Sequence, residues 1–111
     1  MENERKVFLI YVAGSRYENS DGSSRIKYLL GLTNSDKLKL IREPDNPFDQ
    51  YAIKVVYGNN FQIGYIPMEK SKIITEYLTQ GYKYEIPKFS IIRADIGYRL
   101  SCEFKLIMIK E

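Results

Sequence analysis

Residues 43–53 of the chain read EPDNPFDQYAI and join two alternating runs of apolar and polar residues. The run before this stretch, Lys37–Arg42, and the run after it, Tyr51–Tyr57, have the period of two that is typical of β-strands. Pro47 fixes its own φ angle and keeps Asn46 out of the helical region, so the connecting loop has few backbone conformations available. We therefore expect a strand–loop–strand unit whose rigid loop can hold side chains in fixed positions.

The rest of the chain predicts further strands and two helices around this unit. We expect strands at Lys6–Ala13, Phe61–Ile66, Tyr82–Ile86, Lys88–Arg93 and from Tyr98 to Met108, a turn at Ala94–Gly97, and helices at Arg25–Leu30 and Pro67–Gln80. The first run is continuously apolar, which is typical of a strand buried on both faces in the centre of a sheet. Gly64 within a strand indicates a β-bulge or the close approach of another backbone.

Three groups of side chains are predicted to face the core. They are Ile26, Leu29 and Leu30 in the first helix, Ile73, Ile74, Tyr77 and Leu78 in the second helix, and Tyr98, Leu100, Cys102, Phe104, Leu106 and Met108 in the last strand. About six strands and two short helices in so short a chain predict a mostly β fold, built as a small antiparallel barrel or strongly bent sheet.

Length and composition indicate a single domain over residues 1–111. The chain has 44% hydrophobic and 28% charged residues, a balance that is typical of soluble globular proteins. It contains no apolar run near the roughly 20 residues of a membrane helix, and its start lacks the pattern of a secretory signal. Cys102 is the only cysteine, so an internal disulfide is excluded. We expect a cytoplasmic protein with no membrane association.

The absence of histidine restricts the possible chemistry. A Ser-His-Asp triad, a histidine base and a His-ligated zinc site are all excluded, and one cysteine cannot build a structural zinc site. The sequence therefore predicts a non-catalytic protein without cofactors. Its net charge of +3 is compatible with nucleic-acid binding but is most simply explained by a solvated surface.

The loop within residues 43–53 has three interpretations. Glu43, Asp45 and Asp49 could supply oxygen ligands to a metal ion, although the glycine and closing glutamate of a calcium loop are missing. Asp45 and Asn46 could instead bond the local backbone while Phe48 packs into the core. In the third interpretation, Phe48 stacks on a flat ligand and Asp49 accepts a hydrogen bond from a hydroxyl group. Taken alone, the loop is explained by turn chemistry.

The order of three motifs adds a family resemblance. The sequences VAG at 12–14, LKLIREPDNPFDQYAIKV at 38–55 and QIGYIP at 62–67, the last followed by a helix that ends at Gly81, together resemble the HIRAN domain. The resemblance implies an OB-like β-barrel. Such domains stand alone in bacteria and phages, or lie at the N-terminus of helicase-like chromatin remodellers, where they recognise the 3′ end of single-stranded DNA.

The resemblance also implies a set of contact residues. Arg16 would meet a phosphate and Tyr17 would stack on a base; Phe48 would pack against the terminal nucleotide, and Asp49 would take the free 3′-hydroxyl. The remaining expected contact residues are Asn46, Tyr65 and Lys70. Met68 and Glu69 stand where a basic residue would help to hold a phosphate.

Together with these residues, the resemblance implies a non-catalytic module that binds single-stranded DNA at free 3′-hydroxyl ends, in DNA repair or processing, with a helicase or nuclease protein as a further partner. Two alternatives remain open at this point. One is a protein-interaction or self-association module on the same fold, and the other is a metal-dependent nuclease that uses Glu43, Asp45 and Asp49. The sequence does not discriminate between DNA and RNA.

Overall fold

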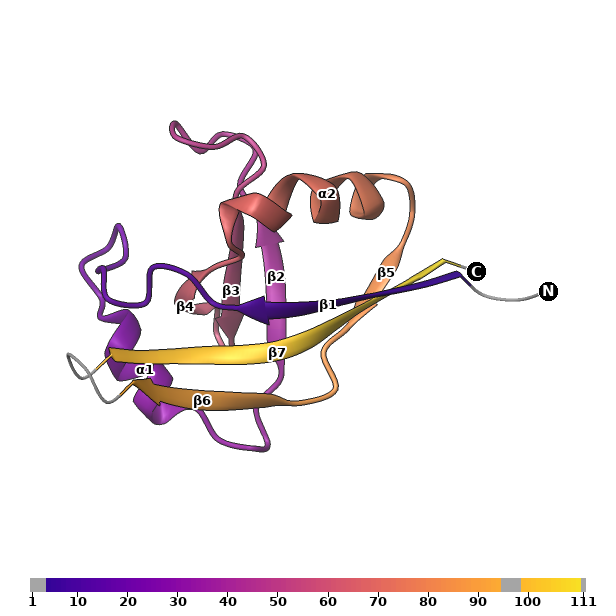
Figure 1. Cartoon of the computed structure of the whole chain (residues 1–111). Helices are drawn as coiled ribbons and strands as arrows, with labels where there is room; N and C mark the ends of the chain where they lie inside the picture. Colours follow the sequence, from indigo (N-terminus) through magenta and orange to yellow (C-terminus); the bar gives the residue numbers. More distant parts are fainter. Residues whose placement is uncertain (1–3, 95–98, 111) are drawn as a thin grey trace.

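The computed structural model describes residues 4–94 and 99–110, and Figure 1 shows the arrangement of their strands and helices. The elements are β1 (Glu4–Tyr11), α1 (Arg25–Gly31), β2 (Leu38–Arg42), β3 (Ile53–Tyr57), β4 (Phe61–Tyr65), α2 (Met68–Thr79), β5 (Lys83–Glu85), β6 (Phe89–Ala94) and β7 (Arg99–Lys110). The prediction of a mostly β chain with two short helices is confirmed. No helix in the described ranges is long and apolar enough to cross a membrane.

The strands form two antiparallel sheets. One contains β2, β3 and β4 in that order. In the other, the long strand β7 pairs with β1 along one edge and with β5 and β6 along its other edge. Figure 1 shows β2 and β3 running across the direction of β1 and β7. The two sheets share one hydrophobic core, to which Ile10, Val55 and Leu106 each contribute a fully buried side chain.

The expected six-stranded barrel is not found: the described residues form seven strands in two open sheets. The contact of β5 with β2 is made by a side chain, because the Tyr84 hydroxyl accepts a hydrogen bond of 3.0 Å from the Leu40 amide. β5 has only three residues and ends before Pro87, which lacks the amide hydrogen needed to continue a ladder. A longer β5 would be needed to close the sheets on this side.

The first strand is an edge strand, and the prediction that it is buried on both faces is wrong. Within the described residues β1 pairs with β7 alone, which places it at an edge, and its side chains alternate between the core and solvent. On the outer face, Val7, Leu9 and Tyr11 are 61%, 44% and 50% exposed, whereas Ile10 on the inner face is fully buried. Its apolar run therefore reflects a core face together with an exposed apolar face.

The last strand follows its predicted pattern. Cys102, Phe104, Leu106 and Met108 are buried on one face of β7, and Leu100 packs against the same core. Burial raises the pKa of the Cys102 thiol to about 12, so this residue is an unreactive part of the core. Tyr98 and the turn expected at Ala94–Gly97 lie outside the described residues, except for Ala94 at the end of β6.

Helix α1 begins at Arg25 as predicted, and α2 begins at Met68, one residue after the predicted start at Pro67. The Ser24 side chain accepts a hydrogen bond from the Lys27 amide at the start of α1, and α2 follows Pro67 directly. In α1, Leu29 is buried but Leu30 is 59% exposed, so Leu30 does not share the core-facing side as expected.

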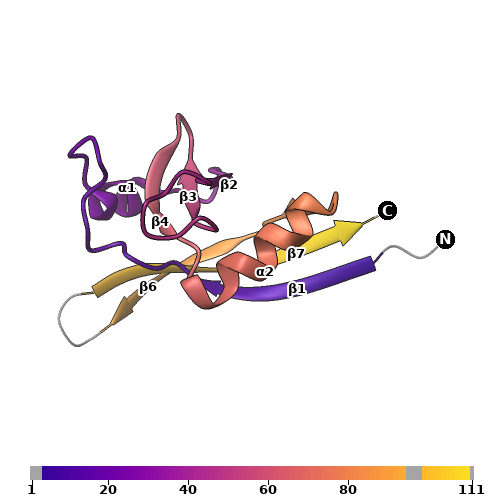
Figure 2. The same cartoon turned by 90° about the horizontal axis from the view of Figure 1, so that it is seen from above.

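The buried face of α2 differs from the prediction. Figure 2 shows α2 running alongside β1, and the rings of Tyr77 and Phe8 lie 6.1 Å apart between these elements. Ile74 is buried as expected, but Ile73 is 39% exposed, and the small polar residues Ser71 and Thr75 are buried instead. The Ser71 and Thr75 hydroxyls donate hydrogen bonds to the loop that precedes β3, so polar contacts with this loop help to set which face of α2 is covered.

The predicted role of Gly64 is confirmed. The β3–β4 register shifts between Val55 and Val56, opposite Gly64, and a Cβ atom at Gly64 would lie 2.5 Å from the Ala13 carbonyl oxygen. The close approach is a bridge between the two sheets, because Ala13 and Tyr65 exchange two backbone hydrogen bonds of 2.8 and 2.9 Å. It brings the segment that leaves β1 next to the loop between β2 and β3.

Candidate nucleic-acid interface

Asn46 organises the loop between β2 and β3. Its side-chain oxygen accepts hydrogen bonds from the amides of Phe48 (2.9 Å) and Asp49 (3.1 Å), and its side-chain nitrogen donates to Glu43 Oε1 (3.2 Å). An asparagine that bonds the backbone two and three residues further on holds a turn in one conformation. The turn chemistry predicted for Asn46 is therefore present, but Phe48 does not pack into the core.

Glu43 joins the loop to β3 and β4. Its carboxylate accepts a hydrogen bond from the Tyr65 hydroxyl (2.7 Å) and lies 3.1 Å from the Lys54 ammonium. Burial acts to raise the pKa of Glu43, but the hydrogen bonds from Tyr65, Lys54 and Asn46 outweigh burial, and the net pKa is lowered. Burial and the hydrogen bond to Glu43 both raise the pKa of Tyr65. Glu43 therefore stays ionised and serves as an anchor for the loop.

Two exposed aromatic rings stand beside this framework. The Phe48 side chain is 92% exposed, and Tyr17, in the segment that leaves β1, is 56% exposed. Arg16 Nη2 donates a 2.8 Å hydrogen bond to the Tyr17 hydroxyl, and the Arg16 guanidinium carbon lies 4.9 Å from the centroid of the Tyr17 ring. A phenylalanine with almost its whole surface in water contributes no burial free energy to folding and is available to a partner that covers it.

A cleft of about 780 Å³ lies between these loops. It is lined by Ala13, Gly14, Tyr17, Arg25, Asn46, Pro47, Phe48, Asp49, Ala52, Tyr65, Ile66 and Met68. Five of the seven residues expected at the site thus surround one cavity: Tyr17, Asn46, Phe48, Asp49 and Tyr65. The other two lie outside the lining, Arg16 against Tyr17 and Lys70 with its ammonium bonded to the Leu9 carbonyl oxygen.

Asp49 has a partly satisfied carboxylate at the wall of the cleft. Its Oδ1 accepts a hydrogen bond from the Tyr51 amide (2.9 Å), and its Oδ2 lies 3.2 Å from the Ser71 hydroxyl. The same hydroxyl lies 3.2 Å from the Met68 carbonyl oxygen, and a hydroxyl has one proton to donate. Asp49 Oδ2 therefore keeps the capacity to accept a hydrogen bond from a ligand.

Arg25 is a cleft residue that the sequence analysis placed only as the first residue of α1. It is 8% exposed, with Nε donating to Asn19 Oδ1 (2.7 Å) and Nη1 to the Gly14 carbonyl oxygen (2.8 Å). Its guanidinium carbon lies 5.2 Å from the centroid of the Tyr65 ring. The available signal was an arginine directly after a helix N-cap, where the helix dipole disfavours a cation.

The carboxylates of the loop do not form a metal site. In residues 4–94 and 99–110, no group of three or more Asp, Glu or Cys side chains is placed to hold one ion. Glu43 is bonded to Tyr65 and Lys54, whereas Asp49 faces Tyr51 and Ser71.

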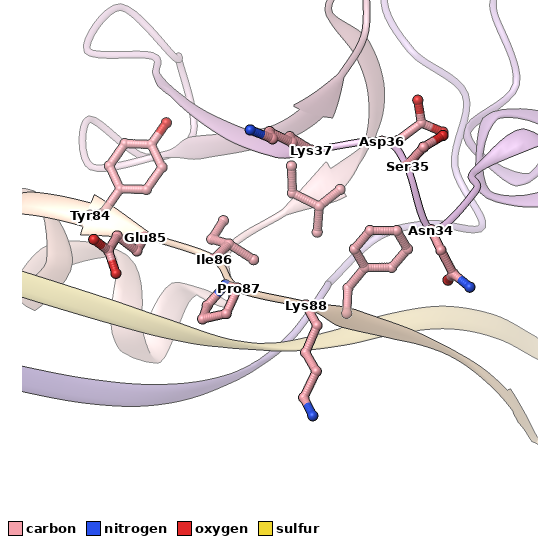
Figure 3. A pocket seen from close by; sticks show the side chains of 11 residues that line it. Asn34, Ser35, Asp36, Lys37, Tyr84, Glu85, Ile86, Pro87 and Lys88 are labelled. Atoms are coloured by element: carbon pink, nitrogen blue, oxygen red, sulfur yellow. The ribbon is translucent and has the colours of Figure 1, made fainter.

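A second hollow, of about 810 Å³, lies at the opposite end of β2, between the loop that precedes this strand and the connection from β5 to β6. Figure 3 shows its lining, in which Lys88 points away from the loop containing Lys37. Its aromatic residues, Tyr84 and Phe89, are both half-buried against the core.

The fold and this site define a small two-sheet β-protein that displays aromatic rings beside a fixed polar loop. Comparison with known families gives the particular assignment. The family model of the HIRAN domain matches residues 6–108, and the chain belongs to this family.

Individual proteins share part of the sequence or the fold of this chain. A segment of 45 residues is 42% identical to the helicase-like transcription factor of Oryctolagus cuniculus, and it represents 40% of this chain but only 4% of that protein. The fold matches a crystal structure of a protein from Lactobacillus plantarum with a TM-score of 0.69 and 20% identity, over 99% of this chain and 100% of the other. It matches the HIRAN domain of human HLTF with a TM-score of 0.63 and 19% identity, over 95% of this chain and 76% of the other.

Proposed function

We propose that this protein is a non-catalytic module that binds single-stranded DNA and recognises a free 3′-hydroxyl end in the cleft between Tyr17 and Phe48. The observation that carries the proposal is the 92% exposure of Phe48 on a loop whose backbone is held by Asn46. A rigid, solvent-exposed ring beside a second exposed ring is suited to stacking on unpaired bases. Membership of the HIRAN family supports the same choice of ligand.

Asp49 is the residue that would read the strand end. Its Oδ2 can accept a hydrogen bond from a 3′-hydroxyl in addition to the bond from Ser71, and a ligand without this hydroxyl would shield the half-buried carboxylate from water without replacing the lost hydrogen bond. Arg16, next to Tyr17, would contact a phosphate. Lys70 donates one ammonium hydrogen to the Leu9 carbonyl oxygen and has two further donors for a phosphate.

The process that we propose is DNA repair or processing in the cytoplasm, in association with a helicase or nuclease protein. The match to a helicase-like transcription factor supports a helicase as the partner class. A buried, unpaired Cys102 thiol is compatible with a reducing compartment.

Fluorescence anisotropy with matched oligonucleotides tests the end-reading proposal. One ligand ends in a 3′-hydroxyl, a second in a 3′-phosphate, and a third in a 2′,3′-dideoxynucleotide that removes the hydroxyl without adding charge. We expect the first to bind most tightly and Asp49→Ala to abolish the difference. Lys37→Ala, a change at the far hollow, should weaken all three ligands to the same small extent. Equal affinity of the wild-type protein for the three ligands would contradict end recognition.

An interaction module is the second candidate, and a specific surface favours it. Val7, Leu9 and Tyr11 form an exposed apolar row on the outer face of β1. Sedimentation of the wild-type protein at low and high salt measures this function, since self-association through apolar surface would persist in high salt. A monomer at all concentrations would leave DNA binding as the better account. No arrangement of carboxylates within the described ranges favours the nuclease alternative.

A further inference from the structure

Arg25 is a nearly buried cation without an acidic partner in the described part of the chain. Its side chain is 8% exposed, and the acceptors of its Nε and Nη1 atoms, Asn19 Oδ1 and the Gly14 carbonyl oxygen, are both neutral. The single ion pair found within residues 4–94 and 99–110 joins Lys54 to Glu43. Removing a guanidinium charge from water without a counter-charge is unfavourable, so an arginine in this position calls for an anion.

The position of Arg25 points to where that anion would sit. Arg25 lines the same cleft as Tyr17, Phe48 and Met68. No side-chain nitrogen or oxygen is both fully buried and without a hydrogen bond in the described ranges, and the described bonds of Arg25 use Nε and Nη1. The Nη2 end of the fork is therefore the part that reaches solvent, and Arg25 lines both the cleft and an adjoining hollow of about 590 Å³ that Glu18, Glu43 and Asp45 also line.

The cleft lining holds one cation, Arg25, and one carboxylate, Asp49. Met68, in the same lining, is uncharged, and Lys70, outside it, donates a hydrogen bond to the Leu9 carbonyl oxygen. The Arg25 guanidinium lies over the Tyr65 ring, and the Tyr65 hydroxyl donates a hydrogen bond to Glu43. The charge of Glu43 is already balanced by Lys54. Arg25 is thus the cation of the cleft lining, supplied by α1 instead of by the start of α2.

We propose that Arg25 binds one backbone phosphate near the 3′ end of the single strand. This inference rests on the proposed DNA-binding function and adds a residue to that site. An arginine held by Asn19 and Gly14 presents its remaining N–H groups in a fixed direction, as a planar fork suited to phosphate oxygens.

The test combines a neutralised ligand with a neutralised side chain. A methylphosphonate, which removes the charge of one phosphate, is placed at each successive linkage from the 3′ end of the oligonucleotide. We expect one linkage at which this change weakens wild-type binding by roughly 10- to 100-fold, the range for losing a hydrogen bond to a charged group. Arg25→Gln should bind the unmodified strand more weakly and show no further loss at that linkage.

The salt dependence gives a second readout that a structural defect would not change in the same way. Loss of one phosphate contact should reduce the slope of log affinity against log salt concentration by about 0.7 for a single strand. Asn19→Ala breaks an anchor of Arg25 but keeps its charge, so it should keep the slope. Lys37→Gln removes one positive charge at the hollow of Figure 3. In this control variant, the methylphosphonate at the sensitive linkage should weaken binding as much as it does in the wild-type protein.

The inference is overturned if, at every linkage, the methylphosphonate weakens binding by Arg25→Gln as much as it weakens binding by the wild-type protein. If Arg25→Gln does not fold, the Nε–H resonance of Arg25 in the wild-type protein, assigned by its absence in Arg25→Lys, replaces that comparison. The Arg25 Nε–H resonance should shift when the unmodified strand binds and should not shift when the strand with the neutralised sensitive linkage binds. Identical shifts with the two strands overturn the inference. A wild-type protein that binds no oligonucleotide overturns the proposed function itself, whereas 3′-hydroxyl preference without coupling to Arg25 overturns only this inference.

Discussion

The two ends of β2 carry hollows of nearly equal size, about 780 and 810 Å³, but their aromatic residues are used differently. At the end near Arg42, Asn46 satisfies the loop amides and leaves Phe48 exposed. At the other end, the Tyr84 hydroxyl accepts from the Leu40 amide, and Phe89 packs against the core. The volumes of the two hollows therefore do not distinguish the two ends of β2, whereas the exposure of their aromatic rings does.

The largest effect is expected from Gly64→Ala, which acts on the bridge that brings the two walls of the cleft together. The new Cβ atom would lie 2.5 Å from both the Ala13 carbonyl oxygen and Val12 Cγ1, so the Ala13–Tyr65 bridge would have to open. We expect a loss of about 3 kcal/mol in the free energy of unfolding, at the upper end for overpacking a core, measured by urea denaturation. Gly31→Ala, at the end of α1, should cost far less, and equal losses in the two variants would show that the bridge is not special.

The aromatic residues of the two ends should respond in opposite ways to truncation. Phe48→Ala should weaken binding of single-stranded DNA by about 1–3 kcal/mol with little change in stability, because the exposed ring contributes stacking and no core packing. Phe89→Ala should lower the free energy of unfolding by roughly 2 kcal/mol, less than for a fully buried phenylalanine, and leave the affinity unchanged. Anisotropy titrations and urea denaturation of both variants measure the contrast. A loss of affinity in Phe89→Ala would contradict the distinction between the two ends.

Asn46→Ala should affect both properties. It removes the acceptor for the Phe48 and Asp49 amides, and we expect a destabilisation of about 1–2 kcal/mol because side-chain hydrogen bonds of this kind each contribute near 1 kcal/mol. The affinity should fall as well, because Phe48 and Asp49 would lose their fixed relation. Anisotropy titration and urea denaturation of Asn46→Ala measure the two effects. A variant that is destabilised but binds with wild-type affinity would show that the loop need not be rigid before it binds.

The elements around the cleft could be predicted because their signals are local. Pro47 and Asn46 restrict the loop, Pro67 marks the start of α2, and Gly64 marks the approach of the first segment. Each signal depends on a few neighbouring residues and on backbone sterics, and these local restrictions are the same in the folded structure.

The remaining features depend on contacts between distant segments. An apolar run such as that of β1 has the same sequence pattern whether its second face is covered or exposed, so its place at the edge was not predictable. In α2, the hydrogen bonds of Ser71 and Thr75 to the loop before β3 help to bury small polar residues in place of Ile73. Arg25 enters the cleft only because Gly14 and Asn19 are brought to it by the turn that leaves β1.

The smallest effect expected is a pH dependence that belongs to the cleft end of β2 alone. Glu43 has a net lowered pKa because its hydrogen bonds with Tyr65, Lys54 and Asn46 outweigh burial, which acts in the raising direction. Since the pKa is lower in the folded state, Glu43 contributes stability above the ordinary value of 4.5, and this contribution is lost as the pH falls through the folded-state pKa. Urea denaturation of wild type and Glu43→Gln between pH 3 and pH 7 should therefore give free energies that differ more at neutral pH than at acid pH. A constant difference across this range would mean that the charge of Glu43 does not stabilise the loop, and that Asn46 alone holds Phe48 in place.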